Sequence, residues 1–202
     1  ICKRIPIGGG LGGGSSDAAC VLISLNFLCG TGMSREELKP LAAQIGSDVP
    51  FFLHGPAALV GGRGEEVESF MPEKTWWVLL VDPGFSISTA DAFKWLDEFN
   101  DHSSSQDSDF AGLNTELRED NQLGQYYNSF EPILRRRFPS IEIILNVLEK
   151  NGAALASVSG SGSLCFGLFN SYEKASRASD VIKGSRIWIK ETLASSLYGV
   201  LQ

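Results

Sequence analysis

Residues 5–19 of the chain are Ile-Pro-Ile-Gly-Gly-Gly-Leu-Gly-Gly-Gly-Ser-Ser-Asp-Ala-Ala, and they continue into an apolar stretch that predicts a helix. Successive glycines let backbone N–H groups come close to a ligand, because no Cβ stands in the way. The helix that follows begins with unpaired N–H groups and the positive end of its dipole, which both favour an anion. A flexible glycine linker does not usually end in an apolar helix. The stretch therefore predicts a phosphate-binding loop, with Ser15 or Ser16 capping the helix.

The composition describes a chain that can bury a core. Of its 202 residues, 43% are hydrophobic and 20% are charged, which excludes global disorder and allows one large domain or two small ones. The formal net charge of -7 argues against a surface for nucleic acid or for an anionic membrane. No apolar run approaches the roughly 20 residues of a membrane span. Four cysteines without metal-ligand spacing fit a reducing, cytoplasmic setting.

Two features bear on the domain organisation. The chain begins at Ile1, only a few residues before the glycine-rich loop, whereas an α/β unit needs more chain ahead of such a loop. We therefore expect a preceding segment. A second unit begins near Lys74, which gives domains at residues 1–73 and 74–202, and the last residues are expected to pack back on the first domain.

The first domain contains helix and hairpin signals. Its first helix is expected to stop at Gly30. Residues 34–37, Ser-Arg-Glu-Glu, form a capping box for a second helix, which Gly46 ends. Residues 47–53 are a short segment with a proline near its start, as the first turn of a helix permits. A hairpin is expected from strands at 57–60 and 65–70 around Gly-Gly-Arg-Gly.

The second domain alternates strands and helices. Strands are expected at residues 76–81, 155–158, 164–169 and 186–192, and helices at about 90–99 (capped by Ser88 or Thr89), 121–137, 140–150 and 172–182. Without the two inserted helices, the order is β-α-β-β-α-β, the ferredoxin-like split arrangement. Residues 100–112, rich in serine and aspartate, are expected to form a solvated loop.

Three kinds of phosphate-binding loop compete for residues 8–16. A P-loop ends in Gly-Lys-Ser or Gly-Lys-Thr, and this stretch has no lysine. The dinucleotide-binding fingerprint fits formally at Gly8, Gly10 and Gly13, but charged residues and a proline precede it, and no well-placed acidic residue ends a second strand. The third kind is a glycine-rich loop followed by Ser-Ser-x-Ala-Ala, found in two-domain kinases without the P-loop lysine.

Residues 6–19 resemble the ATP-binding motif of the GHMP kinases, a family that includes galactokinase, homoserine kinase and mevalonate kinase. Further segments resemble family segments in the same order along the chain: Gly46–Phe52, Gly61–Glu65, Pro83–Phe93 and Ser159–Phe166. The resemblance spans nearly the whole chain. It implies an α+β fold of two domains, with an incomplete ribosomal-S5-domain-2-like N-terminal domain and a ferredoxin-like βαββαβ C-terminal domain.

The resemblance also implies a small-molecule kinase that uses ATP and Mg²⁺. Backbone amides of the glycine-rich loop would hold the triphosphate, and Ser16 could reach Mg²⁺, which prefers oxygen ligands. Helix capping is the alternative role of the two serines. The residues that the resemblance implies for ATP binding are Pro6, Gly8, Gly9, Gly10, Leu11, Gly12, Gly13, Gly14, Ser15 and Ser16.

Asp48 is the candidate catalytic residue, as the general base or as the carboxylate that orients the acceptor hydroxyl. Its position alone is equally compatible with a helix N-terminal aspartate that the dipole favours, and the resemblance supports the catalytic role. The resemblance implies that Phe93 stacks on a cytosine of the substrate; the alternative is a ring that faces the core from a helix that Thr89 caps. The candidate substrate-binding residues are Thr89, Phe93, Ser159, Gly160, Ser161 and Gly162.

The form Gly-Gly-Gly-Ser-Ser-Asp-Ala-Ala is especially similar to family members that phosphorylate a hydroxyl of diphosphocytidyl-methylerythritol, a cytidyl-diphosphate sugar alcohol of the non-mevalonate isoprenoid pathway. A different alcohol acceptor, or a nucleotide-binding fragment without activity, are the alternatives. A small molecule is the expected partner, without nucleic acid or membrane, for a monomer or a homodimer.

Two departures from the family pattern stand out. The first family motif, with a lysine and with aromatic and histidine substrate contacts, would lie before Ile1. The usual Asn-Asp-Phe-Glu segment reads Asn-Ser-Phe-Glu here, at residues 128–131, so that position 129 lacks its acidic side chain. His54 is interpreted as structural, and Arg135–Arg137 as a solvated helix end that complements the dipole.

Overall fold

The computed structural model describes residues 6–54, 57–62, 64, 66–70, 74–100 and 126–192. These residues fall into two compact units. One is built from the described residues of Gly12–Glu73, and the other from those of Ile1–Leu11 and Lys74–Thr192. The glycine-rich loop thus supplies residues to both units: its first part, up to Leu11, is counted with the second half of the chain.

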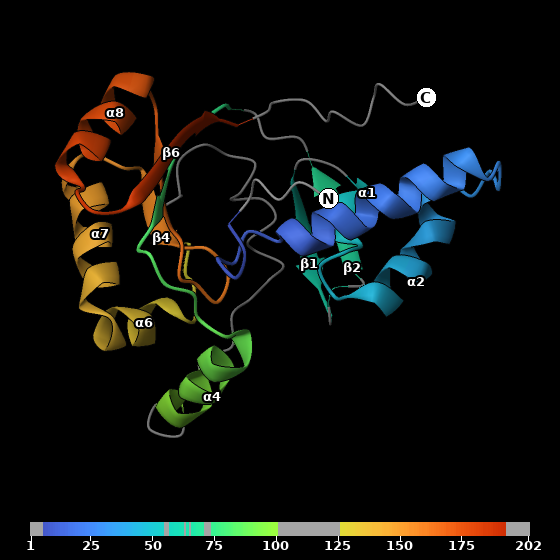
Figure 1. The fold of residues 1–202 in the computed structure, drawn as a ribbon, viewed down its shortest axis with the longest axis horizontal. Coiled ribbons are helices and arrows are strands. Elements are labelled where there is room, and N and C mark those ends of the chain that lie inside the picture. Colours follow the sequence, from blue (N-terminus) through green and yellow to red (C-terminus); the bar gives the residue numbers. More distant parts are fainter. Residues whose placement is uncertain are drawn as a thin grey trace. The chain divides into compact units, whose positions relative to one another are not determined.

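The first unit has three helices followed by a hairpin (Figure 1). Its described elements are α1 (Gly13–Leu28), α2 (Arg35–Ile45), α3 (Phe51–His54), β1 (Ala57–Gly61) and β2 (Glu66–Phe70). The two strands pair antiparallel, as the sequence predicted. The three helices enclose a small core of Ala19, Leu38, Ala42, Val49 and Leu53.

The predicted capping box of α2 is confirmed. Ser34 accepts a hydrogen bond from the Glu37 backbone N–H, and the Glu37 carboxylate accepts one from the Ser34 backbone N–H at 2.8 Å. The bonds that the Ser34 backbone N–H and the Ser34 hydroxyl donate to the Glu37 carboxylate lower the pKa of Glu37, because they favour its charged form. The first backbone donors of the helix are therefore satisfied by its own sequence.

The second unit is a four-stranded sheet with helices packed on it. Its described elements are β3 (Trp77–Asp82), α4 (Thr89–Asn100), α6 (Glu131–Arg137), α7 (Pro139–Lys150), β4 (Leu155–Val158), β5 (Cys165–Phe169), α8 (Tyr172–Val181) and β6 (Arg186–Glu191). Figure 1 shows α7 and α8 on the same side of the strands, with α8 above α7 in this view. The core between them is apolar, with Leu79, Phe169, Ile141 and Leu145 all fully buried.

The strand order β4-β5-β3-β6 confirms the ferredoxin-like prediction. All three pairings are antiparallel, so β3 and β4 run parallel with β5 between them, and β5 and β6 run parallel with β3 between them. Each βαβ unit is therefore split by a strand of the other. Val81, near the end of β3, pairs with Cys165 at the start of β5, so the loops that flank these residues leave the sheet at one end.

One predicted helix is shorter than expected. The sequence suggested a helix over 121–137, but residues 126–130 are not helical and α6 begins at Glu131. The side chain of Asn128 accepts a hydrogen bond from the Phe130 backbone N–H at 2.9 Å, which forms a local turn in place of a helical turn. A proline then occupies the first turn of α6, as its missing donor allows.

The predicted loop at 100–112 lies outside the described residues, apart from Asn100 at the end of α4. None of the described helices is long and apolar enough to cross a membrane.

Candidate active site

Gly12 takes the place of the predicted serine cap. It has a left-handed backbone (φ +62°), and α1 begins at Gly13, so Ser15 and Ser16 lie inside the first turn. The prediction that one of these serines caps the helix is wrong. The physical reason is that a glycine adopts the left-handed conformation without a steric penalty from a Cβ atom. Gly12 can therefore precede the helix directly, and α1 begins before the two serines. The Ser16 hydroxyl instead donates to the Gly13 carbonyl oxygen at 3.0 Å.

The N-terminus of α1 leaves backbone donors open. The first helical bond runs from the Ser16 N–H to the Gly12 carbonyl at 2.9 Å, so the N–H groups of Gly13, Gly14 and Ser15 have no helical acceptor. In this helix, which the structure describes in full, the first turn carries no acidic side chain and no side-chain cap. This helix end therefore has the donors and the dipole that bind an anion.

The segment that carries Asp48 is held from two sides. The next two residues, Val49 and Pro50, are buried, while the Asp48 side chain is exposed. Gly64, in the turn of the β1–β2 hairpin, lies against the same segment: a Cβ there would be 2.2 Å from the Ser47 carbonyl oxygen. Asp48 is thus an exposed carboxylate on a fixed backbone.

This segment also packs against the start of α1. The Phe52 ring, on α3, lies over Gly12, where a Cβ would be 2.8 Å from its Cζ atom. Val49 and Leu53 join Ala19 of α1 in the same core. The first unit therefore brings the N-terminal end of α1 and the segment of Asp48 into one packed cluster.

In the second unit, the first part of the glycine-rich loop lies on the β4–β5 turn. A Cβ on Gly10 would be 1.9 Å from the Ser159 carbonyl oxygen, and one on Gly9 would be 2.2 Å from Leu164 Cδ1. The Ser159 hydroxyl donates to the Gly10 carbonyl oxygen at 2.9 Å. Two predicted sites, 149 residues apart, are thus in direct contact. A Cβ at Gly10 would meet backbone atoms, whereas one at Gly9 would require the Leu164 side chain to move.

The same turn reaches the predicted substrate segment. Ser161 Oγ lies 3.0 Å from Thr89 Oγ1 and is 9% exposed. The Ser163 hydroxyl donates to the Phe85 carbonyl oxygen. Ser88, the residue before α4, accepts from the Asp91 N–H at 3.4 Å, so Ser88 rather than Thr89 caps the helix. The Thr89 hydroxyl is left to contact the turn.

Phe93 lies on the exposed side of α4. Its ring is 53% exposed and meets the edge of Phe130 at a centroid distance of 5.0 Å and an interplanar angle of 86°. An aromatic ring that is held on one side and open on the other can stack on a planar ligand. A ring that faces the core would be buried, so the alternative interpretation of Phe93 does not fit its exposure.

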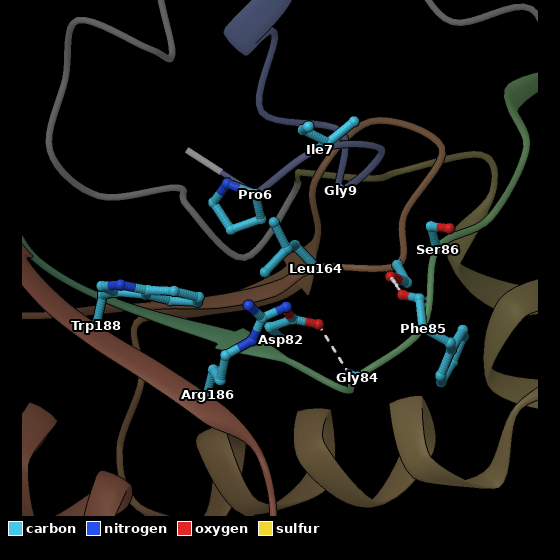
Figure 2. A pocket seen from close by; sticks show the side chains of 11 residues that line it. Pro6, Ile7, Gly9, Asp82, Gly84, Phe85, Ser86, Leu164, Arg186 and Trp188 are labelled. Atoms are coloured by element: carbon cyan, nitrogen blue, oxygen red, sulfur yellow. Dashed lines mark hydrogen bonds and ion pairs between the residues drawn. The ribbon is translucent and has the colours of Figure 1, made fainter. Parts of the chain in front are cut away.

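A cavity of about 510 Å³ lies beside the first part of the loop (Figure 2). Pro6, Leu164 and Trp188 surround it, and Asp82 and Arg186 face each other across its floor. Asp82 is buried, accepts from the Gly84 N–H at 2.8 Å and forms an ion pair with Arg186 Nη2 at 2.5 Å. The sequence did not single out this pair, because its members are 104 positions apart on neighbouring strands.

Other titratable groups near the elements of the site are structural. His54 Nε2 is buried without a hydrogen-bond partner among the described residues, and burial lowers the pKa of His54. Arg135 is only 20% exposed and binds three carboxylates, so the interpretation of its helix end as solvated is wrong for this residue. Within the part of the chain that the structure describes, no group of three or more His, Cys, Asp or Glu side chains could hold a metal ion.

Comparison with known proteins bears on this arrangement. Residues 1–56 match the family model described as GHMP kinases N terminal domain, and residues 103–185 match GHMP kinases C terminal. A relative from Thermodesulfovibrio yellowstonii, named 4-diphosphocytidyl-2-C-methyl-D-erythritol kinase, is 38% identical over 199 residues, which are 96% of this chain and 70% of the relative. The chain belongs to the GHMP kinases. The family inferred from the motifs is thereby confirmed.

A second relative and a solved structure show which members of the family this chain is similar to. A relative from Xanthomonas euvesicatoria with the same name is 40% identical over 198 residues, which are 97% of this chain and 62% of the relative. The chain thus spans about three fifths of that relative's length. A crystal structure of 4-(cytidine 5'-diphospho)-2C-methyl-D-erythritol kinase superposes with a TM-score of 0.74 at 32% identity, over 94% of this chain and 68% of that one. The α+β GHMP kinase fold is confirmed.

Proposed function

We propose that the protein transfers the γ-phosphoryl group of ATP to a hydroxyl of 4-diphosphocytidyl-2-C-methyl-D-erythritol, a step in isoprenoid precursor biosynthesis. The relatives of 35–40% identity carry the name of this activity. The observation that carries the proposal is the cluster in the first unit. An uncapped helix N-terminus and the fixed segment of an exposed carboxylate are packed together there through Gly12 and Phe52.

The phosphates of ATP fit the start of α1. The open N–H groups of Gly13, Gly14 and Ser15 supply donors, and the helix dipole adds a positive field. A loop that contains glycine at six of the nine positions from 8 to 16 lets phosphate oxygens reach the backbone. The proposal assigns the whole stretch from Pro6 to Ser16 to nucleotide binding.

Mg²⁺ is part of the proposal, and the residues fit it. The ion keeps several waters and takes few protein oxygens beside substrate phosphates, so it does not need a cluster of acidic side chains. The Ser16 hydroxyl donates a hydrogen bond to the Gly13 carbonyl oxygen, which leaves the lone pairs of the hydroxyl oxygen available to a cation. When bound, the ion neutralises charge that develops on the phosphates.

Asp48 is proposed to act on the acceptor hydroxyl. Its carboxylate oxygen would accept a hydrogen bond from that hydroxyl and take its proton as the new O–P bond forms and ADP leaves. An exposed side chain on a backbone held by Val49, Pro50 and Gly64 can do this without reorganising the loop.

The second unit is proposed to bind the acceptor. Phe93 offers an open ring to the cytosine, and Thr89 with Ser159–Gly162 offers hydroxyls and backbone amides to the polar groups. The proposal includes a cytoplasmic protein that acts on a small molecule, supported by cysteine content and charge.

A second candidate is a nucleotide-binding chain without turnover. It is favoured by one observation, that position 129 has a serine where the family segment carries an acidic side chain. The two candidates share ATP binding and differ in phosphoryl transfer.

The deciding experiment measures ATP-dependent phosphorylation of 4-diphosphocytidyl-2-C-methyl-D-erythritol by the protein. We expect product with the wild type and a fall in kcat of at least about 100-fold in Asp48→Asn, as for loss of an acid–base group. Asp180→Asn, at an exposed aspartate of α8, is the matched control and should leave kcat unchanged. ATP binding without product supports the second candidate, and full activity of Asp48→Asn removes this residue from the mechanism.

A further inference from the structure

The side chain of Asn128 holds the turn between β4 and β5. Its Nδ2 donates to the carbonyl oxygens of Val158 and Gly160, both at 2.9 Å. Its Oδ1 accepts from the Phe130 backbone N–H at 2.9 Å. Both amide protons and the amide oxygen are therefore used, which fixes the orientation of the group. One side chain from outside the hairpin thus brackets the first residues of the turn.

The turn depends on such a bracket. Gly160 and Gly162 have positive φ angles of +55° and +80°. Glycine adopts positive and negative φ about equally well, so these two residues do not fix the backbone of the turn by themselves. Within the turn, the Gly162 N–H donates to the Ser159 carbonyl oxygen at 2.9 Å. The carbonyl oxygen of Gly160 is bound instead by the Asn128 amide. The clamp by Asn128 therefore acts on the positions of the Ser159 and Ser161 hydroxyls, together with the contacts of Ser159 to Gly10 and of Ser161 to Thr89.

Phe130, two residues further on, supports the other proposed binding residue. Its ring meets Phe93 in an edge-to-face arrangement at 5.0 Å, while Phe93 remains 53% exposed. Such a contact restricts the rotamers of an exposed aromatic side chain without covering it.

The segment is anchored to the sheet by the residue that follows. Glu131 accepts from Ser157 Oγ, on β4, at 2.5 Å and from Arg135 Nε at 2.9 Å. Residues 128, 130 and 131 thus face three different partners: the turn, the Phe93 ring and the strand that leads into the turn. A serine at position 129, exposed and between them, takes no part in these contacts.

We propose that Asn128 and Phe130 are positioning residues for the cytidyl acceptor: Asn128 sets the Ser159–Gly162 turn, and Phe130 sets the ring of Phe93. The inference rests on the proposed function. Neither residue needs to touch the acceptor. Their effect is on the binding of the cytidyl diphosphate part of the substrate and not on the phosphoryl-transfer step.

Two variants test this. Asn128→Asp keeps the shape but loses both donors and places a carboxylate against two carbonyl oxygens. Phe130→Ala removes the support of Phe93. We expect each to raise KM for the diphosphocytidyl acceptor by about tenfold, with KM for ATP and kcat within about twofold of wild type.

Matched controls separate positioning from loss of stability. Asn151→Asp loses a similar amide-to-carbonyl bond, from Nδ2 to the Val147 oxygen at 2.7 Å, at the far end of β4 from the turn. Tyr172→Ala removes a similar edge-to-face partner, that of Trp77 at 5.1 Å. These variants should lower Tm without changing KM for the acceptor. If the two test variants lower Tm or the active fraction but leave KM for the acceptor unchanged, the inference is overturned.

The binding of cytidine 5′-diphosphate, measured by calorimetry, separates this inference from the proposed function. An active wild type whose test variants keep the acceptor KM leaves the function standing and overturns the inference. A wild type that binds the nucleotide without turnover overturns the proposed kinase activity. In that case, about tenfold weaker binding in both test variants supports the inference, and equal binding overturns it. A wild type with neither turnover nor binding overturns both.

Discussion

Gly10 and Ser159 are joined by two contacts that leave no space between them. The Ser159 hydroxyl donates to the Gly10 carbonyl oxygen at 2.9 Å, and a Cβ on Gly10 would lie 1.9 Å from the Ser159 carbonyl oxygen. The glycine at position 10 is therefore required for packing on the β4–β5 turn, in addition to any ligand that its backbone approaches.

Gly10→Ala is expected to destabilise the protein by at least about 2 kcal/mol, because the new Cβ meets backbone and the residue has a positive φ. Urea unfolding measures this loss. Gly14→Ala is the control: its Cβ would meet no described atom within 4 Å, and an alanine in α1 should stabilise by up to about 1 kcal/mol. Equal stabilities of the two variants would show that the Gly10 contact is absent in solution.

Gly64→Ala is expected to lower kcat as well as stability. The new Cβ would lie 2.2 Å from the Ser47 carbonyl oxygen and must displace the backbone before Asp48. Gly32→Ala shares the positive φ but has open space around its Cβ, so it carries the backbone strain of about 1–2 kcal/mol alone. Steady-state kinetics of both variants isolate the clash. A kcat for Gly64→Ala that equals that of Gly32→Ala would contradict this account of the Asp48 segment.

Arg135→Met is expected to destabilise the second unit by about 2 kcal/mol, because three carboxylates lose a shared partner. The guanidinium binds Glu131 on its own helix, and Glu142 and Glu149 on α7. Arg136→Met, at the exposed neighbouring position, should stay within about 0.5 kcal/mol of wild type. The comparison uses thermal or urea unfolding at neutral pH. Similar losses in both variants would show that the three ion pairs contribute little.

His54 predicts a pH dependence of stability. Burial lowers the pKa of His54 in the folded protein. The negative charge of Glu36 raises this pKa by a smaller amount, and the positive charges of Lys39 and Arg35 lower it further. The unfolded chain takes up a proton near pH 6.5, whereas the folded chain does so only at lower pH. The free energy of unfolding should therefore fall as the pH drops below 6.5, and level off below the folded-state pKa.

His54→Leu should remove this part of the slope between pH 7.5 and 5.5. Urea titrations at several pH values in this window measure it for both proteins. The other histidine, His102, is present in both and cancels in the difference. Parallel curves for the two proteins would show that His54 titrates alike in the folded and unfolded chain.

Local rules were sufficient for much of the fold. The Ser34–Glu37 capping box, the β1–β2 hairpin and the split sheet follow from turn residues, caps and alternating elements, and the structure has them where they were expected. The start of α1 was placed too late, because several glycines in succession offer more than one entry into a helix and serine preference does not choose between them.

Contacts between distant residues could not be predicted. Arg135 looks like one of three arginines at a helix end, and only the packing of α7 against α6 shows that it is the partly buried one. The bonds from Asn128 to the turn cross 30 and 32 positions of sequence, and no periodicity encodes them. The one sequence signal for Asn128 was the match of residues 128–131 to a family segment. That match drew notice to the missing acidic residue at position 129 and not to the asparagine.

The pairing of Val81 with Cys165 has an evolutionary consequence. It fixes the end of the sheet from which both the 83–88 loop and the 159–164 turn emerge. Asn128 bonds to this turn, and Phe130 contacts Phe93 on α4, the helix that follows the loop. Under the proposed function, the residues that select an acceptor thus lie in short connections and on α4, while the strands and α7 and α8 carry the stability. Exchange of these connections between relatives is a route to new acceptors that leaves the hydrophobic core unchanged.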